Sequence, residues 1–457
     1  QFNGQAEAGL QIGARWRGMG AKGTIIDEVT VFDDALTALE VVHLFDKKQF
    51  QEFIQKPFEA LTASEKDLLQ AYYLARYSQR SAQIRQDLEA LHYDHNSTLD
   101  TVQEMMVIQE MKNPRQSYIL DRGLYDSPLD AVFPNTPEAI LSLPEKYPKN
   151  RLGLAKWLFH PDHPLTARVA VNRLWQLYFG QGLVATPNDY GNQGSLPSHP
   201  ELLDWLAIEF QESGWDIKKM IKLMVLSSTY QQSSQASDIT QQADPENTFL
   251  ARGPSKRLSA EMIRDNVLAA SGLLNKKIGG KSVRPYQPQG LWRINGARYQ
   301  QDTGDQLYRR SLYTLWKRTV PNPTQATFDA PDRANCTVKR QETSTPLQAL
   351  VLLNDPIFIE SARAIGYSIS KEPDIETGIQ DAFRKLTGRH AQKEELELLL
   401  ALQETELMKF QIEPDKRQGW LNTGEYKSDN IIDGAILAAN TVVASTIINA
   451  DATIVKR

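Results

Sequence analysis

Cysteine is almost absent from this 457-residue sequence, which contains only Cys336. A single cysteine excludes an internal disulfide, a zinc site built on paired cysteines, and a Cys-x-x-Cys-His haem attachment within the chain. One cysteine suits a reducing or an oxidising compartment, so composition leaves the localisation open. The sequence also lacks any apolar run that approaches the ~18 residues of a membrane-spanning helix, and we expect no membrane span.

An excess of basic charge is missing too. The chain has 51 Lys and Arg residues against 56 Asp and Glu residues, a formal net charge of -5. A nucleic-acid-binding protein normally shows a dominant basic surface, so we expect no nucleic acid among the partners. The first residues, Gln-Phe-Asn-Gly, have no initiator Met and no apolar signal segment, and we expect the sequence to be part of a longer protein.

The chain changes character along its length, which suggests three parts. Residues 1–45 contain β-rich runs, such as Thr24–Phe32, between glycine-rich turns, and predict strands. Residues 46–101 are polar with apolar residues at helical spacing, and predict a helical spacer. Residues 102–457 predict many helices with few strands, so the expected fold class is mainly α-helical with small β elements (α+β).

Several helices carry sequence marks at their start. Ser198-His199-Pro200-Glu201 and Thr345-Pro346-Leu347-Gln348 predict capping boxes, and Ser259 predicts the start of a helix that runs to about Leu274. Residues 217–225 place apolar side chains at i, i+3, i+4, i+7 and i+8, which predicts a core-facing stripe rather than a cofactor site. Residues 280–343 predict irregular backbone, apart from a β-like run over 309–318.

Long motifs connect most of the chain to a known family. They include "NRLGLAKWLFHPDHPLTARVAVNRLWQLYFGQGLV" from Asn150, "PSHPELLDWLAIEFQESGWDIKKMIKLMVLSSTYQQSS" from Pro197 and "TFDAPDRANCTVKRQETSTPLQALVLLNDP" from Thr327. With these motifs, residues 102–457 resemble the C-terminal domain of unknown function found in planctomycete cytochrome c-like proteins. The segment "KGTIIDEVTVFDDALTALEV" is similar to the closing strands of laminin-G/concanavalin-like sandwich domains, which makes residues 1–45 a short β-sandwich remnant.

The resemblance carries further expectations. The family's domain follows a haem-binding cytochrome segment and a second domain of unknown function, so these are the expected partners, and haem c is expected upstream with no cofactor in this chain. The family is exported and abundant in bacteria that degrade complex polysaccharides, so a periplasmic or extracellular location is implied. It transfers no established catalytic residues.

Two groups of residues could bind a substrate. Arg168, Asn172 and Trp175 lie at i, i+4 and i+7 of one helix and could recognise a sugar or an anion, although we favour a buried network that braces the loop 182–197. If residues 309–318 form a strand, Arg310, Trp316 and Arg318 share a face with Leu312 and Thr314. Two guanidiniums beside a Trp suit a sulfated or carboxylated sugar, whereas structural salt bridges of a buried strand are the favoured alternative.

The segment 327–340 is the densest polar loop. Asp329 and Asp332 near Arg340 and other basic residues could perform general acid and base work, but we favour ion pairs formed within the segment. Cys336 has no partner motif, and we expect a buried, inert thiol. His199, at a helix start, is a further catalytic candidate with a favoured structural role.

His160-Pro-Asp-His163 could ligate a metal, yet capping and packing suffice for both histidines, and no metal site is predicted.

Two functions remain open. One is an accessory or interaction domain in polysaccharide processing. The alternative is an extracellular polysaccharide-active enzyme, hydrolytic or oxidative, whose site is shared with upstream domains. Convergence of Asp329, Asp332 and the 310–318 run on a deep cleft would favour the enzyme, and pairing and burial of these residues would favour the accessory domain.

Overall fold

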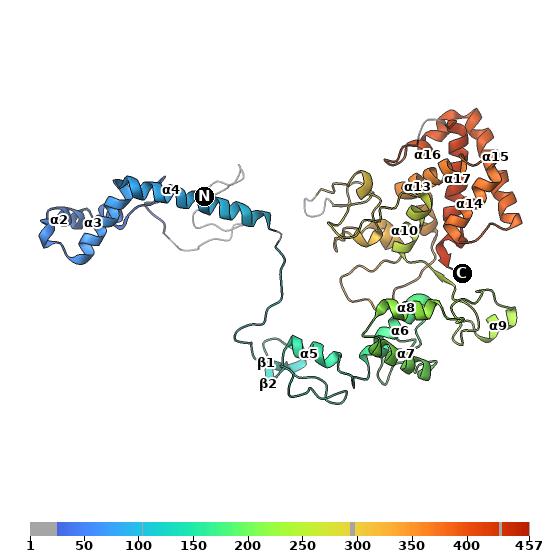
Figure 1. Ribbon diagram of the computed structural model, residues 1–457, viewed down its shortest axis with the longest axis horizontal. Helices are drawn as coiled ribbons and strands as arrows, with labels where there is room; N and C mark the ends of the chain where they lie inside the picture. The colour runs from blue at the N-terminus through green and yellow to red at the C-terminus, as the bar shows by residue number, and fades with distance from the viewer. Residues whose placement is uncertain (1–24, 103, 293–297, 429–431, 457) are drawn as a thin grey trace. The chain divides into compact units, whose positions relative to one another are not determined.

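The computed structural model describes residues 25–102, 104–292, 298–428 and 432–456. Within them the chain is mainly helical with two small two-stranded sheets, as the sequence predicts (Figure 1). Its contacts divide it into two compact units, Gln1–Arg115 and Gln116–Arg457. In the described parts, none of the helices has both the length and the apolar character needed to cross a bilayer.

The described part of the first unit is helical. It contains α1 (Ala38–Phe45), α2 (Lys47–Ile54), the short 3-10 helix η2 (Phe58–Ala60), α3 (Ala63–Arg76) and α4 (Gln79–Thr101). Leu39, Phe53 and Leu61 form a small buried core. Arg76 of α3 donates from Nε to Glu40 of α1 at 2.7 Å, and this contact fixes α1 on α3. The helical structure predicted for residues 46–101 is confirmed.

Residues 25–37 contain no strand, so the strand predicted over Thr24–Phe32 is wrong for its described part. Ile25 is 93% exposed and Val31 is 75% exposed. A strand is stable only when neighbouring strands satisfy its backbone and cover one face, and no other described segment pairs with this one. Residues 1–24 lie outside the described residues, and the sandwich assignment stays a prediction.

The second unit begins with an antiparallel hairpin. Its strands are β1 (Ser117–Leu120) and β2 (Pro128–Val132), and the 3-10 helix η3 (Asp121–Gly123) follows β1. After the proline-rich segment comes α5 (Arg151–Leu158). Trp157 of α5 is buried and donates from its indole to the carbonyl of Leu141 at 2.7 Å, which ties the proline-rich segment to the helix.

Three helices then share one core: α6 (Thr166–Phe179), α7 (Pro200–Glu212) and α8 (Ile217–Val225) (Figure 1). Met220 and Met224 of α8 are almost fully buried in this core, which confirms the packing role predicted for the apolar stripe. The short helix α9 (Asp238–Ala243) follows.

The capping box predicted at Ser198 is not formed. The helix α7 does begin at Pro200, but the capping position is His199, whose side chain makes no capping hydrogen bond. Ser198 stands one residue too early to cap, and its hydroxyl donates to the carbonyl of Leu183 instead. The prediction was wrong because the helix begins one residue later than the box requires, which makes His199 and not Ser198 the capping position.

The rest of the unit is a helical bundle around α17. Its elements are β3 (Lys256–Arg257), α10 (Ala260–Ser271), α11 (Pro323–Thr327), α12 (Pro346–Asn354), α13 (Pro356–Ile369), α14 (Ile375–Thr387), α15 (Lys393–Ile412), α16 (Gln418–Asn422), α17 (Gly434–Asn449), α18 (Asp451–Ile454) and β4 (Val455–Lys456), with 3-10 helices η5 (Gly304–Gln306), η6 (Ser311–Tyr313) and η7 (Pro414–Arg417). Helix α17 is apolar on all sides because α13, α15 and further helices cover it (Figure 1). The helix start predicted at Ser259 is confirmed, since its side chain accepts from the amide of Met262.

The run 309–318 is not a strand. It contains the 3-10 helix η6 and only isolated bridges, such as Val283 to Thr314. Arg309 is 2% exposed and its guanidinium donates to the carbonyls of Lys281, at 3.0 Å, and Gly279, at 2.6 Å. The alternation of polar and apolar residues over 309–318 thus does not come from a strand. Its first residue, Arg309, is buried and holds the irregular loop 277–281 through backbone carbonyls.

Candidate functional site

Asp329 is held by groups far away in the sequence. Its carboxylate accepts from Arg257 of β3 at 2.6 Å and from the amide of Thr343 at 2.8 Å. Burial favours the protonated form, but the hydrogen bonds from Thr343 and Arg257 outweigh it and hold the pKa of Asp329 below its usual value. Asp329 is also in the left-handed region, with φ of 61°. Asp329 is thus an ionised anchor of the loop 327–343.

Arg340, at the other end of this loop, makes a two-pronged ion pair with Glu261 of α10, at 2.7 and 3.2 Å. The prediction of ion pairs within 327–340 is therefore wrong, because the partners Arg257 and Glu261 lie more than 60 residues earlier in the chain. The burial predicted for Cys336 is wrong as well, since this free cysteine is exposed.

Trp316 and Asp332 are brought together. The indole of Trp316 donates to the backbone carbonyl of Asp332 at 2.9 Å, and the guanidinium of Arg333 lies 4.6 Å from the centre of the indole ring. Trp316 is partly exposed, whereas Arg310 and Arg318 are exposed. The guanidinium beside the Trp is thus Arg333 rather than the two arginines of the sequence hypothesis. Arg333 also has a left-handed backbone, with φ of 60°, which is costly for an arginine.

The residues proposed on α6 brace their surroundings. Arg168 donates to Asp204 of α7 at 2.6 Å. Asn172 is fully buried, donates to the carbonyl of Val184 at 3.1 Å, and accepts from its amide at 2.8 Å. Trp175 is 6% exposed and stacks on Phe179. The favoured bracing role is confirmed for Asn172, which holds the start of the loop 182–197.

The histidines of the central block also make local contacts. Nδ1 of His163 accepts from the amides of Leu165 and Thr166 at the start of α6, and its ring packs edge to face on Trp157. His199 is half-buried and its Nδ1 lies 3.0 Å from the hydroxyl of Ser198. The described residues contain no group of three or more His, Cys, Asp or Glu side chains placed to hold a metal ion.

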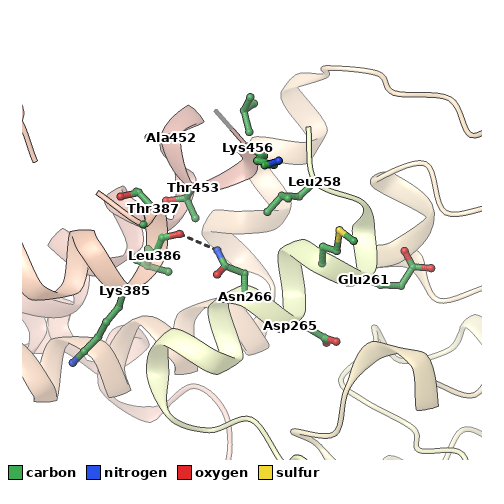
Figure 2. A pocket seen from close by; sticks show the side chains of 13 residues that line it. Leu258, Glu261, Asp265, Asn266, Lys385, Leu386, Thr387, Ala452, Thr453 and Lys456 are labelled. Carbon is green, nitrogen blue, oxygen red and sulfur yellow. Dashed lines mark hydrogen bonds between the residues drawn. The ribbon is translucent and has the colours of Figure 1, made fainter. Parts of the chain in front are cut away.

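A hollow of about 520 Å³ opens between α10, the end of α14 and the C-terminal elements α18 and β4 (Figure 2). Its lining is Leu258, Glu261, Met262, Asp265, Asn266, Lys385, Leu386, Thr387, Gly388, Ala452, Thr453, Val455 and Lys456. In Figure 2, Asn266 reaches from α10 to the carbonyl of Leu386 on α14, a hydrogen bond of 3.0 Å that fixes the two helices at the floor of the hollow. None of the predicted site residues lines it, but Arg340 holds Glu261 at its edge.

Sequence reasoning missed the polar residues of this hollow. Glu261 and Asp265 are four residues apart on α10, a spacing that could have indicated two carboxylates on one helical face. Burial raises the pKa of Glu261, yet the hydrogen bonds from Arg340 and from its own backbone lower it further, to below the usual value. Asp265 accepts at 2.8 Å from both the amide and the hydroxyl of Ser311. Both carboxylates are therefore engaged by the protein.

Comparison with known proteins places the chain in a family. A search of curated proteins and a search of solved structures found no match. A family model described as "Protein of unknown function (DUF1553)" matches residues 150–403, which is more than half of the 457 residues. The matched segment starts at the N-cap of α5 and ends within α15, so it includes the α6–α8 core, the loop 327–343 and most of the hollow. The chain belongs to the DUF1553 family.

Proposed function

We propose that this chain is an accessory domain that binds an anionic polysaccharide on the surface formed by Trp316, Asp332 and Arg333. The observation that carries the proposal is the arrangement of Trp316, whose indole is fixed by the carbonyl of Asp332 and has a guanidinium 4.6 Å from its ring centre. A fixed indole offers a flat apolar face for a sugar ring, and an adjacent guanidinium binds a carboxylate or sulfate with two hydrogen bonds.

The state of the acidic candidates supports binding rather than catalysis. Asp329 is paired with Arg257, and Glu261 is paired with Arg340, so two carboxylates are committed to holding the loop. A general acid needs a carboxyl whose pKa is raised towards neutrality, whereas both of these have a lowered pKa. These residues are better suited to present a surface.

The setting of the domain is part of the proposal. We place it in an exported bacterial protein of the planctomycete type, in which it docks against an upstream cytochrome c and a second domain of unknown function. Haem c would be held by the upstream part. This setting rests on the sequence motifs from Asn150 to Thr327 that resemble such proteins, and purification of the full-length protein with its haem would test it directly.

The enzyme alternative is favoured by one observation. Glu261 and Asp265, two carboxylates one helical turn apart on α10, both line the hollow of Figure 2. With a lowered pKa, Glu261 would be ionised at neutral pH and would act as a base or a stabilising anion, so a polysaccharide-active enzyme would need its acid from elsewhere. An upstream domain that shares the site could supply that acid.

The proposal is tested by retention of the purified chain on neutral, carboxylated and sulfated polysaccharides. We expect retention on an anionic glycan, and a loss of affinity of about tenfold or more in Trp316→Ala and Arg333→Ala, because anchors at a binding site commonly contribute over about 1 kcal/mol. Trp205→Ala and Arg389→Ala are matched controls. Trp205 is exposed on α7, and Arg389 stacks on the ring of Phe383, so each removes a similar side chain elsewhere.

Unchanged retention in Trp316→Ala would contradict this site, and no retention on any glycan would contradict binding by this chain alone. Reducing ends are assayed in the same fractions. New reducing ends that disappear in Glu261→Gln and Asp265→Asn would replace the accessory function by the enzymatic one.

A further inference from the structure

Charge is distributed unevenly along the chain. Residues 276–340, which we call the cationic segment, contain 13 Lys and Arg residues against four Asp and no Glu, a net charge of +9. The rest of the chain therefore carries -14, because the whole chain carries -5. A local excess of positive charge of this size attracts anions to that part of the surface and raises their rate of association.

Most of these positive charges are not neutralised by the protein. Arg309 is buried, and Arg340 is paired with Glu261. Arg284 and Lys317 are half-buried. Eight others are exposed, and no salt bridge to any of them occurs in the part of the chain that the structure describes. They include Lys276, Lys277, Lys281, Arg298, Arg310 and Arg318.

The four aspartates of the segment offset little of this charge. Asp329 is paired with Arg257, which lies outside the segment, and the carboxylate of Asp302 accepts from the amide of Arg284 at 2.6 Å. The other two, Asp305 and Asp332, are exposed. An anion that approaches the exposed side of the segment therefore meets many more cationic than anionic groups.

Three of the exposed lysines lie on one loop, residues 276–281, which we call the lysine loop. The buried guanidinium of Arg309 donates to three carbonyls of this loop, those of Lys277 at 3.1 Å, Gly279 at 2.6 Å and Lys281 at 3.0 Å. These bonds fix the backbone of the loop while its lysine side chains stay in water. A site whose backbone is ordered in advance loses less conformational entropy when a ligand binds.

The backbone connects the lysine loop directly to the neighbourhood of Trp316. The amide of Val283 donates to the carbonyl of Tyr313, and the amide of Leu315 donates to the carbonyl of Val283, both at 2.8 Å. Trp316 follows Leu315 in the chain. Arg310, next to the Arg309 that holds the lysine loop, is six residues from Trp316, so their Cα atoms lie at most about 20 Å apart.

We propose that the lysine loop and Arg310 extend the glycan site that begins at Trp316, and that the ligand is a chain with several successive carboxylates or sulfates rather than a single charged sugar. This inference rests on the proposed function and specifies its substrate class. The pair of Trp316 and Arg333 suits one sugar ring and one anionic group. The lysines meet further anionic groups of the same chain as mobile point charges, so they respond to the density of charge and not to the identity of the sugar.

The test measures the affinity of the purified chain for size-fractionated dextran sulfate between about 50 and 200 mM salt, with uncharged dextran as the reference. The logarithm of the affinity falls linearly with the logarithm of the salt concentration, by about 0.7–0.9 for each charge neutralised on a polyanion such as DNA. Combining Lys276→Gln, Lys277→Gln and Lys281→Gln should therefore lower this slope by about 2. Over the fourfold range of salt, the variant should lose about 16-fold less affinity than the unaltered chain.

Two further variants separate the lysine loop from other effects. Lys149→Gln, Lys218→Gln and Lys222→Gln combined is the matched control, because it removes the same charge from exposed lysines outside the segment, and it should keep the slope. Trp316→Ala should weaken binding at every salt concentration but also keep the slope, because an indole has no charge. All six lysines are exposed, so thermal melts of both triple variants should match that of the unaltered chain.

The outcomes distinguish this inference from the proposed function. A salt slope that is the same in the lysine-loop variant and in the unaltered chain would overturn the inference and would not affect the site at Trp316. Absence of binding to dextran sulfate would overturn both. Equal affinity for a single-stranded DNA with the same number of charges would overturn the glycan as the ligand of the segment, since any polyanion would then serve.

Discussion

A variant without the Asn172 side chain distinguishes a ligand-binding from a structural role for this residue of α6. Its expected effect on the free energy of unfolding follows from the hydrogen bonds that are lost. The Asn172 amide makes two hydrogen bonds to the backbone of Val184, which is itself 2% exposed. In Asn172→Ala both backbone groups lose their partner inside the protein. Because each buried polar group left without a partner costs about 1–3 kcal/mol, the loss of both should destabilise the variant by about 2–6 kcal/mol.

Gly182 packs against the Asn172 amide, so a second substitution there tests the same contact. A Cβ added there would lie 2.7 Å from Nδ2 of Asn172 and 2.7 Å from the carbonyl oxygen of Val184. Gly182→Ala alone should cost about 1–3 kcal/mol through this overlap. In the double variant the Asn172 amide is gone, so the Cβ has more room. The double variant should therefore be less destabilised than the sum of the two single variants, by about 1 kcal/mol.

Urea denaturation gives the free energies of unfolding, and hydrogen exchange of residues 166–190 shows whether the loss is local to α6 and its loop. An Asn172→Ala variant within about 0.5 kcal/mol of the unaltered chain would refute the bracing role. A loss of glycan binding in that variant without a loss of stability would restore Asn172 as a binding residue.

Two further predictions concern pH and close packing. Burial lowers the pKa of His163 from its ordinary value of 6.5, so the hydrogen bond that its neutral ring accepts from the amide of Thr166 stabilises the fold above about pH 6.5 and is lost as pH falls through the lowered pKa. The urea midpoint of the unaltered chain should therefore fall between pH 7 and pH 5 by more than the midpoint of His163→Asn. The same fall in both proteins would contradict this. Gly424 has φ of 80°, and a Cβ there would lie 2.5 Å from the carboxyl carbon of Glu360. Gly424→Ala should therefore lower the free energy of unfolding by about 1–3 kcal/mol in a thermal melt. Gly419→Ala is the control and should not lower it, because a Cβ at Gly419 has no atom within 4 Å.

The sequence predicts an element of the fold best when that element is determined by residues close to one another in the chain. The stripe of α8 and the start of α10 at Ser259 follow from residues three or four positions apart, and both are confirmed. The capping box at Ser198 failed by one position, because residue type alone does not say which residue leaves the helical backbone conformation. The run 309–318 failed for a different reason, since its alternating pattern does not show that Arg309 is buried against carbonyls about 30 residues earlier.

The candidate site shows the same limit. The sequence named Trp316 and Asp332 as candidates in separate groups, and it placed Arg310 and Arg318 beside Trp316, whereas the structure places Asp332 and Arg333 there. It could not identify the partners of Asp329 and Arg340, because these lie at β3 and α10, 72 and 79 residues earlier. An ion pair between distant segments leaves no local pattern, and only the fold brings the two charges together.

Three buried arginines explain how this domain packs long irregular segments without sheets. Arg264 of α10 donates to the carbonyls of Leu307, at 2.6 Å, and Arg309, at 2.8 Å. Arg309 binds the carbonyls of the 277–281 loop, and Arg363 of α13 binds the carbonyl of Leu421 at 2.7 Å. Buried carbonyls must have donors, and a guanidinium supplies five of them from one rigid side chain. Burial lowers the pKa of Arg264, yet arginine stays protonated in proteins, so its charge remains available for these contacts. The arginines therefore do for the segments 277–313 and 420–426 what a neighbouring strand does in a sheet, because they supply donors to backbone carbonyls that would otherwise have none.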